Sequence, residues 1–509
     1  MSLRSRRVRR LLGVLVVASL SGSCIQAVLE DVSRPAPRGT LRIGYPEEPV
    51  SLDPIRAVSP AERDLLRPLL PSFFLVTPEL AYEPYLLAEE PTVEVSGDRM
   101  VITFRIRDGA RWSDGRPISV QDVRFTWKVM TDPNLPVADR HGFEFLRGVE
   151  RESDRIGRLV ISPPYAGWRD LFSAGRFVLP EHVTESDPVG SWDRGPPVTA
   201  GPFVVDRWRR GLALVLEHDP MFFGPNPLAE RVRVLFVPDA STAVDLLERE
   251  RLDALAPMLG VGWAHQLMEL PGVVTDRATG PWLVHAVTNP NAGLDAGIRR
   301  RVANAIDRRR FADVLVRGDG RLANSLLAPG QIGYEPAWRR YRPRKATVLT
   351  GVPPITLIYP QSELLILAAR FLQTQLGRAG VVVELIGLDP SMFWGDWLPQ
   401  GRFDVALWET RSGAFPWLDR WVDDGGTSPT TRFSDRRVDA QLGDAAEGAE
   451  YDPTELAAAE RRLARLVPLL PLFQPTATVA AREGVTGIQA NASVDGTFWN
   501  AWNWSLGAS

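Results

Sequence analysis

The sequence predicts an α/β protein with more than one domain and a mostly parallel sheet. The chain has 509 residues, more than one hydrophobic core usually organises, so two or three domains are expected. Between residues 355 and 408 the pattern is strand, helix, strand, helix, strand, an order that produces parallel strands. The composition, 44% hydrophobic and 24% charged, is ordinary for a soluble globular protein.

The first 23 residues have the pattern of a secretory signal peptide. Residues 1–10 carry five Arg and no acid, and ten apolar or small residues follow. Ten helical residues rise about 15 Å, half of a hydrocarbon core of roughly 30 Å, so a permanent membrane span is the weaker interpretation. Removal of this segment lowers Lys plus Arg from 59 to 54 against 62 acidic residues, a net charge of about −8. A mildly acidic exported protein without a basic stripe does not suggest nucleic acid as a partner.

Cys24 is the only cysteine, which excludes an internal disulfide and a cysteine metal cluster. It directly follows the apolar core of the signal, and this arrangement resembles a bacterial lipoprotein processing site, where the new N-terminal Cys is acylated. The alternative is an ordinary signal peptide cut nearby. We expect lipidation at Cys24, a tether over residues 24–38 and a location on the outer face of the cytoplasmic membrane. Stable anchoring needs more than one acyl chain.

The first part of the mature chain has the pattern of a scaffold. Residues 40–45 alternate apolar and polar side chains, which indicates a strand. Residues 100–107 alternate in the same way and are followed by two Asp-Gly turns. Ser119 then begins a helix, with Asp122 three residues later in the position of a capping box. Because each of these residues has a structural role, the segment favours a binding scaffold over a catalytic loop.

The second half of the chain contains a regular α/β unit. Residues 355–359 form the first predicted strand, and Ser362 caps a helix that ends near Gly377. Residues 381–386 and 403–408 form the next two strands. Ligands of such sheets bind beyond the carboxyl ends of the strands. The segment directly after the third strand, Glu409-Thr-Arg-Ser-Gly413, is therefore a candidate binding edge.

Several segments in order along the chain carry a family resemblance. The most specific are FRIRDG at 104–109, WSDGRP at 112–117 and QDVRFT at 121–126. Others are GTLRIG at 39–44, SLDP at 51–54, PYLLAE at 84–89, TAGPF at 199–203, LLERERLD at 246–253, IRRRVANAIDR at 298–308, FDVA at 403–406 and 468–473. Together they resemble extracellular solute-binding protein family 5, the peptide/nickel-binding class of ABC importers that includes oligopeptide- and dipeptide-binding proteins.

The resemblance implies a two-lobe periplasmic-binding-protein fold, class II-like and of type C, with an extra small domain inserted in lobe I. Lobe I would take residues 39–65, 180–285 and 470–509, the extra domain 66–179, and lobe II 286–469. The implied function is that of the extracytoplasmic binding component of an ABC importer. A monomer would capture a peptide or similar small solute between the lobes and deliver it to a membrane permease, whose ATPase is a separate chain.

The predicted ligand-binding residues lie mostly at the candidate binding edge. A tryptophan there stacks on apolar groups or sugar rings, or else belongs to the core. Arg411 falls where oligopeptide binders place ligand contacts, and its guanidinium would pair with a carboxylate, the alternative being a surface arginine. Glu48 precedes a segment that contacts peptide backbone in such relatives. The full set is Glu48, Trp282, Trp408, Glu409, Thr410, Arg411, Phe415 and Trp417.

One departure from the resemblance puts ordinary peptide binding in question. Peptide binders commonly carry an Asp in the loop after the third strand, which pairs with the α-amino group of the peptide. Here no acid occurs between Ser412 and Pro416, and an unpaired buried charge costs about 2–5 kcal/mol. Glu409 or Asp419 would have to substitute. An oligosaccharide is therefore an alternative ligand, because aromatic stacking needs no charge.

An exported hydrolase is the alternative from another class of function. The five His stand singly, and the sequence has neither H-E-x-x-H nor G-x-S-x-G. Paired carboxylates for glycoside hydrolysis have a spatial spacing that a sequence does not display. Because the resemblance favours binding, we expect no enzymatic activity, no metal and no cofactor.

Overall fold

The computed structural model describes residues 39–57, 59–192, 195–237, 239–257, 262–343, 348–413, 418 and 433–507. The predicted signal peptide and tether, the lipidation site Cys24, and the site candidates Phe415 and Trp417 lie outside these residues. None of the helices in these ranges has the length and hydropathy needed to cross a bilayer.

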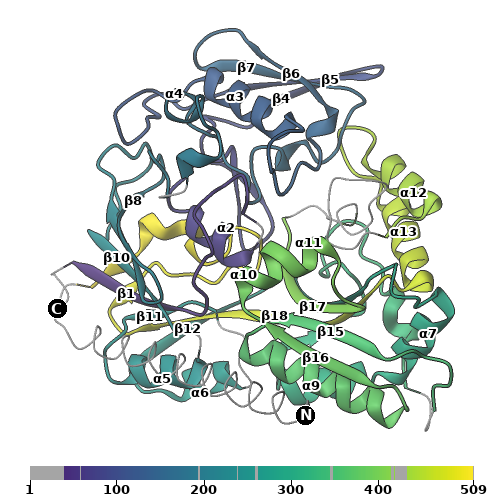
Figure 1. Ribbon diagram of the computed structural model, residues 1–509. Coiled ribbons are helices and arrows are strands. Elements are labelled where there is room, and N and C mark those ends of the chain that lie inside the picture. The colour runs from purple at the N-terminus through teal and green to yellow at the C-terminus, as the bar shows by residue number, and fades with distance from the viewer. Residues whose placement is uncertain are drawn as a thin grey trace, which may run out of the picture.

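A twelve-stranded mixed sheet runs through the molecule (Figure 1). Its order is β16-β15-β17-β13-β18-β11-β1-β10-β9-β8, and β12 and β14 also pair with β18. The strands are β1 (Thr40–Tyr45), β8 (Phe203–Arg209), β9 (Ala213–His218), β10 (Arg231–Phe236), β11 (Ala254–Leu255), β12 (Val273–Thr279), β13 (Trp282–Thr288), β14 (Gly320–Leu322), β15 (Ile355–Pro360), β16 (Val383–Leu388), β17 (Val405–Arg411) and β18 (Leu469–Arg482).

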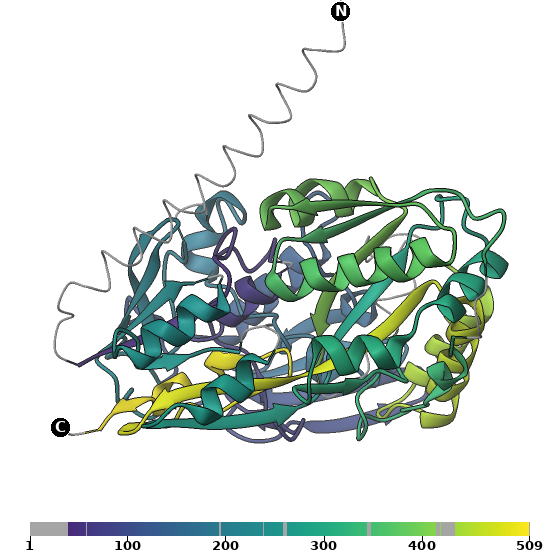
Figure 2. The same cartoon turned by 90° about the horizontal axis from the view of Figure 1, so that it is seen from below.

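The long strand β18 joins two parts of this sheet. One part, here called the β1 side, holds β1 and β8 to β12, and the other, the β15 side, holds β13 to β17. β18 has 14 residues. Its first half pairs with β13 and β14, and its second half pairs with β11 and β12. Figure 2 shows this yellow strand running from one part into the other. The parallel pairing predicted for β15, β16 and β17 is confirmed, as β15 pairs in parallel with both neighbours.

Helices cover both sides of the sheet and begin where sequence signals predict. Ser362 caps α9, where its side chain accepts a hydrogen bond from the N–H of Leu365, and Asp239 caps α5 in the same way. The helices are α2 (Pro60–Leu66), α3 (Val120–Thr131), α4 (Glu181–Thr184), α5 (Ala240–Glu248), α6 (Trp263–Glu269), α7 (Ala296–Ala305), α8 (Arg308–Leu315), α9 (Glu363–Arg378), α10 (Pro390–Met392), α11 (Leu398–Gln400), α12 (Arg436–Ala446) and α13 (Pro453–Leu466).

A second sheet forms a separate layer at the top of Figure 1. It has the order β4-β5-β7-β6, with β4 (Thr92–Ser96), β5 (Arg99–Arg105), β6 (Leu146–Arg151) and β7 (Ile156–Ile161). The predicted alternation along β5 is confirmed, since Met100, Ile102 and Phe104 are buried. Helix α3 follows with the predicted capping box of Ser119 and Asp122.

Smaller pairs of strands complete the fold. β2 (Phe74–Val76) pairs with β3 (Tyr82–Pro84), and β19 (Val485–Thr486) pairs with β20 (Ser505–Leu506). The Trp-rich C-terminal segment packs against the β1 side, because the ring of Phe498 lies 6.0 Å from that of Tyr45 and 5.0 Å from that of Trp504.

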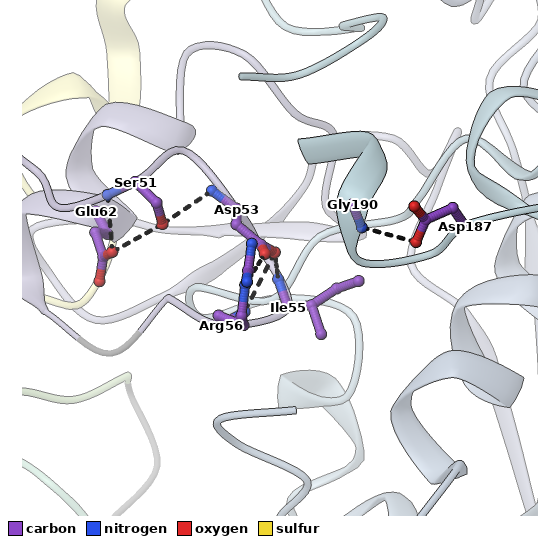
Figure 3. A network of polar contacts seen from close by, with 7 residues as sticks. All are labelled: Ser51, Asp53, Ile55, Arg56, Glu62, Asp187 and Gly190. Carbon is purple, nitrogen blue, oxygen red and sulfur yellow. Dashed lines mark hydrogen bonds and ion pairs between the residues drawn. The ribbon is translucent and has the colours of Figure 1, made fainter. Parts of the chain in front are cut away.

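The loop between β1 and α2 is held by a network of polar contacts (Figure 3). The carboxylate of Asp53, fully buried, accepts a hydrogen bond from the N–H of Ile55 at 2.8 Å and pairs with Arg56. Glu62 accepts from Ser51 and closes the capping box of α2. A separate bond in the same view joins Asp187 to the N–H of Gly190. The SLDP motif therefore has a structural role, fixing the segment that leaves β1.

Candidate functional site

A cleft lies between the β1 side and the β15 side of the large sheet. It holds about 850 Å³ of empty space, part of it open to solvent. The β1 side contributes Tyr45, Pro46, Glu47, Pro60, Ala61, Ala240 and Pro257 to its lining. The β15 side contributes Trp282, Pro360, Gln361, Ser362, Glu363, Leu365, Trp394, Trp408, Glu409 and Arg411.

The strand order explains why this cleft forms. Strands β1 and β15 end at Tyr45 and Pro360, and both ends open into the cleft. This is the carboxyl edge of the parallel pairs, where α/β sheets bind ligands. The helices that follow, α2, α5 and α9, start at the same edge, and their first residues line the cleft. The sequence predicted this edge for the β15 side, but on the β1 side it pointed to Glu48, whereas Tyr45, Pro46 and Glu47 line the cleft.

Tryptophans form one wall of the cleft. Trp282 and Trp408 both line it, although each is only 1% exposed. The ring of Trp408 packs edge-on against His285 at 4.7 Å and against Trp394 at 6.4 Å. Trp394, which sequence reasoning missed, also reaches the lining. Trp282 and Trp408 are thus both core side chains and cleft walls.

Arg411 is engaged by a partner within the protein. Its Nη1 lies 3.2 and 3.1 Å from the two carboxylate oxygens of Asp64 in α2. The hydroxyl of Tyr45 donates to the same carboxylate at 2.8 Å, and the guanidinium lies 4.4 Å from the ring centre of Trp282. The ion pair is almost fully buried, with side-chain exposures of 8% for Arg411 and 1% for Asp64. It connects the β15 side directly to the β1 side.

Two carboxylates face the cleft in a setting that favours their protonated forms. Glu409 accepts a hydrogen bond from the indole N–H of Trp282 at 2.8 Å, and burial raises its pKa against the opposing charge of Arg411. Burial and the negative charge of Glu409 raise the pKa of Glu47 to about 8. The Oε1 atom of Glu47 is buried and has no hydrogen-bond partner in the described part of the chain.

The other two predicted residues within the described ranges do not line the cleft. Thr410 lies in the β13–β17 ladder opposite Leu283. Glu48 turns toward the β8–β9 hairpin, where it accepts hydrogen bonds from the indole N–H of Trp208 at 3.0 Å and the N–H of Gly211 at 2.8 Å. Its neighbour Glu47 faces the cleft instead. The paired acids after β1 were the only sequence signal for Glu47, and they did not tell which of the two points inward.

No group of three or more His, Cys, Asp or Glu in the described residues is arranged to hold a metal ion.

Comparison with known proteins identifies the family. Residues 76–422 match the family model described as bacterial extracellular solute-binding proteins, family 5 Middle. The chain belongs to this family. The oligopeptide-binding protein OppA of Mycobacterium tuberculosis is 28% identical over 440 residues, which cover 78% of this chain and 72% of OppA. The oligopeptide-binding protein AppA of Bacillus subtilis is 23% identical over 333 residues, covering 63% of this chain and 61% of AppA.

Solved structures agree on the fold. AppA from Bacillus subtilis in complex with a nonapeptide matches with a TM-score of 0.82 at 18% identity, covering 92% of this chain and 99% of AppA. The periplasmic EDTA-binding protein EppA matches with a TM-score of 0.79 at 20% identity, covering 93% and 98%. The predicted family and fold class are therefore confirmed, and the chain is a solute-binding protein.

Proposed function

We propose that this solute-binding protein is the extracytoplasmic component of an ABC importer and captures a peptide or similar small solute in the cleft between the β1 and β15 sides. The observation that carries the proposal is that both sides supply the lining, so one ligand touches both. The relatives OppA and AppA, named as oligopeptide-binding proteins, support a peptide. The family's solute-binding class supports release of the ligand unchanged to a permease.

Capture would work by closure of two lobes around the solute. A ligand that contacts both lobes stabilises the closed arrangement by its differential affinity for it. We propose residues 39–65, 180–285 and 470–509 as lobe I, 66–179 as the extra domain and 286–469 as lobe II. β18 pairs with β13 and β14 as far as Pro475 and with β12 from Thr476, which supports a crossing in this strand a few residues after the proposed boundary.

Fluorescence of the tryptophans in the cleft wall provides the test. Peptide and oligosaccharide libraries are added to the purified mature chain, and we expect a spectral shift with peptides. Mass spectrometry of the recovered ligand should show no chemical change. A spectral shift with oligosaccharides alone would show that the ligand is an oligosaccharide and not a peptide. Accumulation of a reaction product would overturn the binding role.

Anchoring by a lipid at Cys24 is part of the same proposal. The lone cysteine behind an apolar signal core supports it. We expect Cys24→Ser to move the protein from the membrane fraction to the soluble fraction in its native host. Retention of the variant on membranes would contradict acylation at this residue.

A further inference from the structure

The lining of the cleft has more acidic than basic side chains. Its carboxylates are those of Glu47, Glu363 and Glu409, and its one basic side chain is that of Arg411. The charge of Arg411 is already balanced by Asp64, which lies behind the lining at 3.1 Å. Among the lining residues that the structure describes, Arg411 is therefore the one cation near Glu47 and Glu409. It is shared with Asp64, and the pKa of both Glu residues stays raised.

The three carboxylates differ in how many hydrogen-bond donors they receive within the protein. Burial raises the pKa of Glu363, and a hydrogen bond from the backbone N–H of Ala240, at the start of α5, partly offsets this. Glu409 uses Oε2 to accept from Trp282, and its other oxygen has no hydrogen bond within the described residues. Glu47 has a buried oxygen that meets no donor in the described part of the chain, although Glu48 beside it receives two hydrogen bonds. A buried acceptor without a donor is costly, so Glu47 marks the place where a ligand group completes the site.

The surroundings of these oxygens favour a charged donor. Burial and the negative charge of Glu409 both raise the pKa of Glu47, so the ionised form of Glu47 is disfavoured in the cleft. One positive charge between them relieves this repulsion, which a neutral N–H does only weakly. The rings of Trp394 and Trp408 line the same cleft and attract cations through their faces.

We propose that the cleft binds an organic cation, a protonated amine or a guanidinium group, which Glu47 and Glu409 hold beside Trp394 and Trp408. The inference rests on the proposed function and names the ligand class of that site. In a peptide, the cation is either the α-amino group or the side chain of Lys or Arg, and the experiment below distinguishes these two sources.

Binding of such a cation is coupled to proton release. Glu47, with a pKa of about 8, holds a proton at pH 7, and it is faced by Glu409 and Arg411 on β17, Glu62 on α2 and Asp389 before α10. A cation favours the ionised carboxylate, so binding of a guanidinium ligand should tighten about tenfold between pH 7 and pH 9. The guanidinium itself stays charged over this range.

The test is calorimetry on the full mature chain with matched probes. These are Ala-Ala-Ala-amide, Ala-Arg-Ala-amide, the N-acetylated form of each, and agmatine. We expect every probe with a positive charge at the preferred position to bind at least tenfold more tightly than N-acetyl-Ala-Ala-Ala-amide. If the α-amino group is the cation, acetylation abolishes this preference in both peptides. If the side chain is the cation, N-acetyl-Ala-Arg-Ala-amide keeps it.

Substitutions of Glu47 and Glu409 test whether these two residues cause the preference for cationic probes. Glu47→Gln and Glu409→Gln should each reduce the preference for the cationic probe about tenfold and flatten its pH dependence. Glu384→Gln, which removes an exposed carboxylate from β16 outside the cleft, should leave both unchanged. The probe series on the unmodified protein gives its own answer if either cleft variant does not fold.

Each outcome separates this inference from the proposed function. Equal affinity for charged and uncharged peptides, or a preference that survives both cleft substitutions, overturns the cation site and leaves peptide capture intact. Binding of agmatine without binding of any peptide supports the cation site and contradicts a peptide ligand. Failure of every cationic probe overturns the cation site, and binding of maltotriose in that case preserves solute capture.

Discussion

At the scale of single residues, the cleft depends on charges whose partners are distant in sequence. Arg411 pairs with Asp64, 347 positions away, and the pair is held by Tyr45 and covered by Trp282. In the sequence Arg411 has the pattern of a ligand contact or a surface residue. Its burial shows that it also connects the two sides of the sheet, so its replacement should reduce stability as well as ligand binding.

Asp64→Asn should lower the free energy of unfolding by about 2–4 kcal/mol, because it leaves the buried guanidinium of Arg411 without its counter-charge. Urea unfolding followed by fluorescence measures the change. Asp245→Asn is the matched control, since its partner Arg249 is 70% exposed and such pairs contribute at most about 1 kcal/mol. Equal effects of the two substitutions would contradict the structural role of the buried pair.

Glu460 gives a pH dependence of stability. It is fully buried, accepts hydrogen bonds from Ser325 and from the N–H of Leu326, and burial raises its pKa to about 8. The folded protein therefore holds a proton that the unfolded chain loses near its ordinary pKa of 4.5. Stability from this group is fully present below about pH 4.5, is lost progressively as pH rises from there, and the loss is complete a little above pH 8.

Glu460→Gln resembles the protonated acid and should flatten this dependence. We expect the variant to melt close to the unmodified protein at pH 5.5 and to lose less stability by pH 8.5, as measured by calorimetric melting. The slope does not vanish entirely, because Glu47 shifts in the same direction. An unchanged slope would show that Glu460 is ionised in the folded protein at pH 7.

At the scale of elements, local sequence patterns predicted most of what the structure contains. The capping box at Ser119, the start of α9 at Ser362 and the strands β15, β16 and β17 lie within a few residues of where the sequence indicates. The helix expected after Asp389-Pro390 is broken into α10, a π-helical turn at Phe393–Trp397 and α11. Pro399 lacks an N–H, so a regular hydrogen-bond ladder does not continue through it.

Gly201, in the TAGPF segment, is required by a close approach of two backbones. A Cβ at this position would overlap the carbonyl oxygen of Pro68, to whose neighbour Leu69 the N–H of Gly201 donates. Gly201→Ala should therefore lower the free energy of unfolding by about 1–3 kcal/mol in urea. Gly148→Ala in β6 is the control, because its Cβ would meet nothing within 4 Å. Equal midpoints for the two variants would contradict this explanation.

At the scale of the whole molecule, two kinds of connection hold the cleft. β18 makes the large sheet continuous, and the pair of Arg411 and Asp64 spans the two sides beyond the sheet. A continuous strand allows bending, whereas an ion pair is either made or broken. We therefore expect the ion pair to favour the closed arrangement proposed above.

Asp64→Asn should accordingly populate a more open shape in the absence of ligand. Small-angle scattering is expected to give a larger radius of gyration for the variant than for the unmodified protein, with a saturating ligand restoring the smaller value. Asp245→Asn serves again as the control. Superimposable scattering curves for all three proteins would show that the ion pair does not govern closure.

The sequence by itself determined the family, through an ordered set of motifs, and the α/β class, the helix caps and the strand that bears Trp408, through periodicity and neighbours a few residues apart. It ended that strand at residue 408, whereas β17 continues through Glu409 to Arg411. Only the tertiary structure decided that Glu47 rather than Glu48 faces the cleft. The choice depends on Trp208 and Gly211, which satisfy Glu48 from 160 and 163 positions away.

The partner of Arg411 was decided in the same way, because burial and pairing arise only when distant strands and helices meet. Phe415 and Trp417 stay predictions, since they lie outside the described residues. The physical reason is general. A local pattern shows which face of its own element is apolar, whereas the charged partner of a side chain depends on which distant segment folds against it.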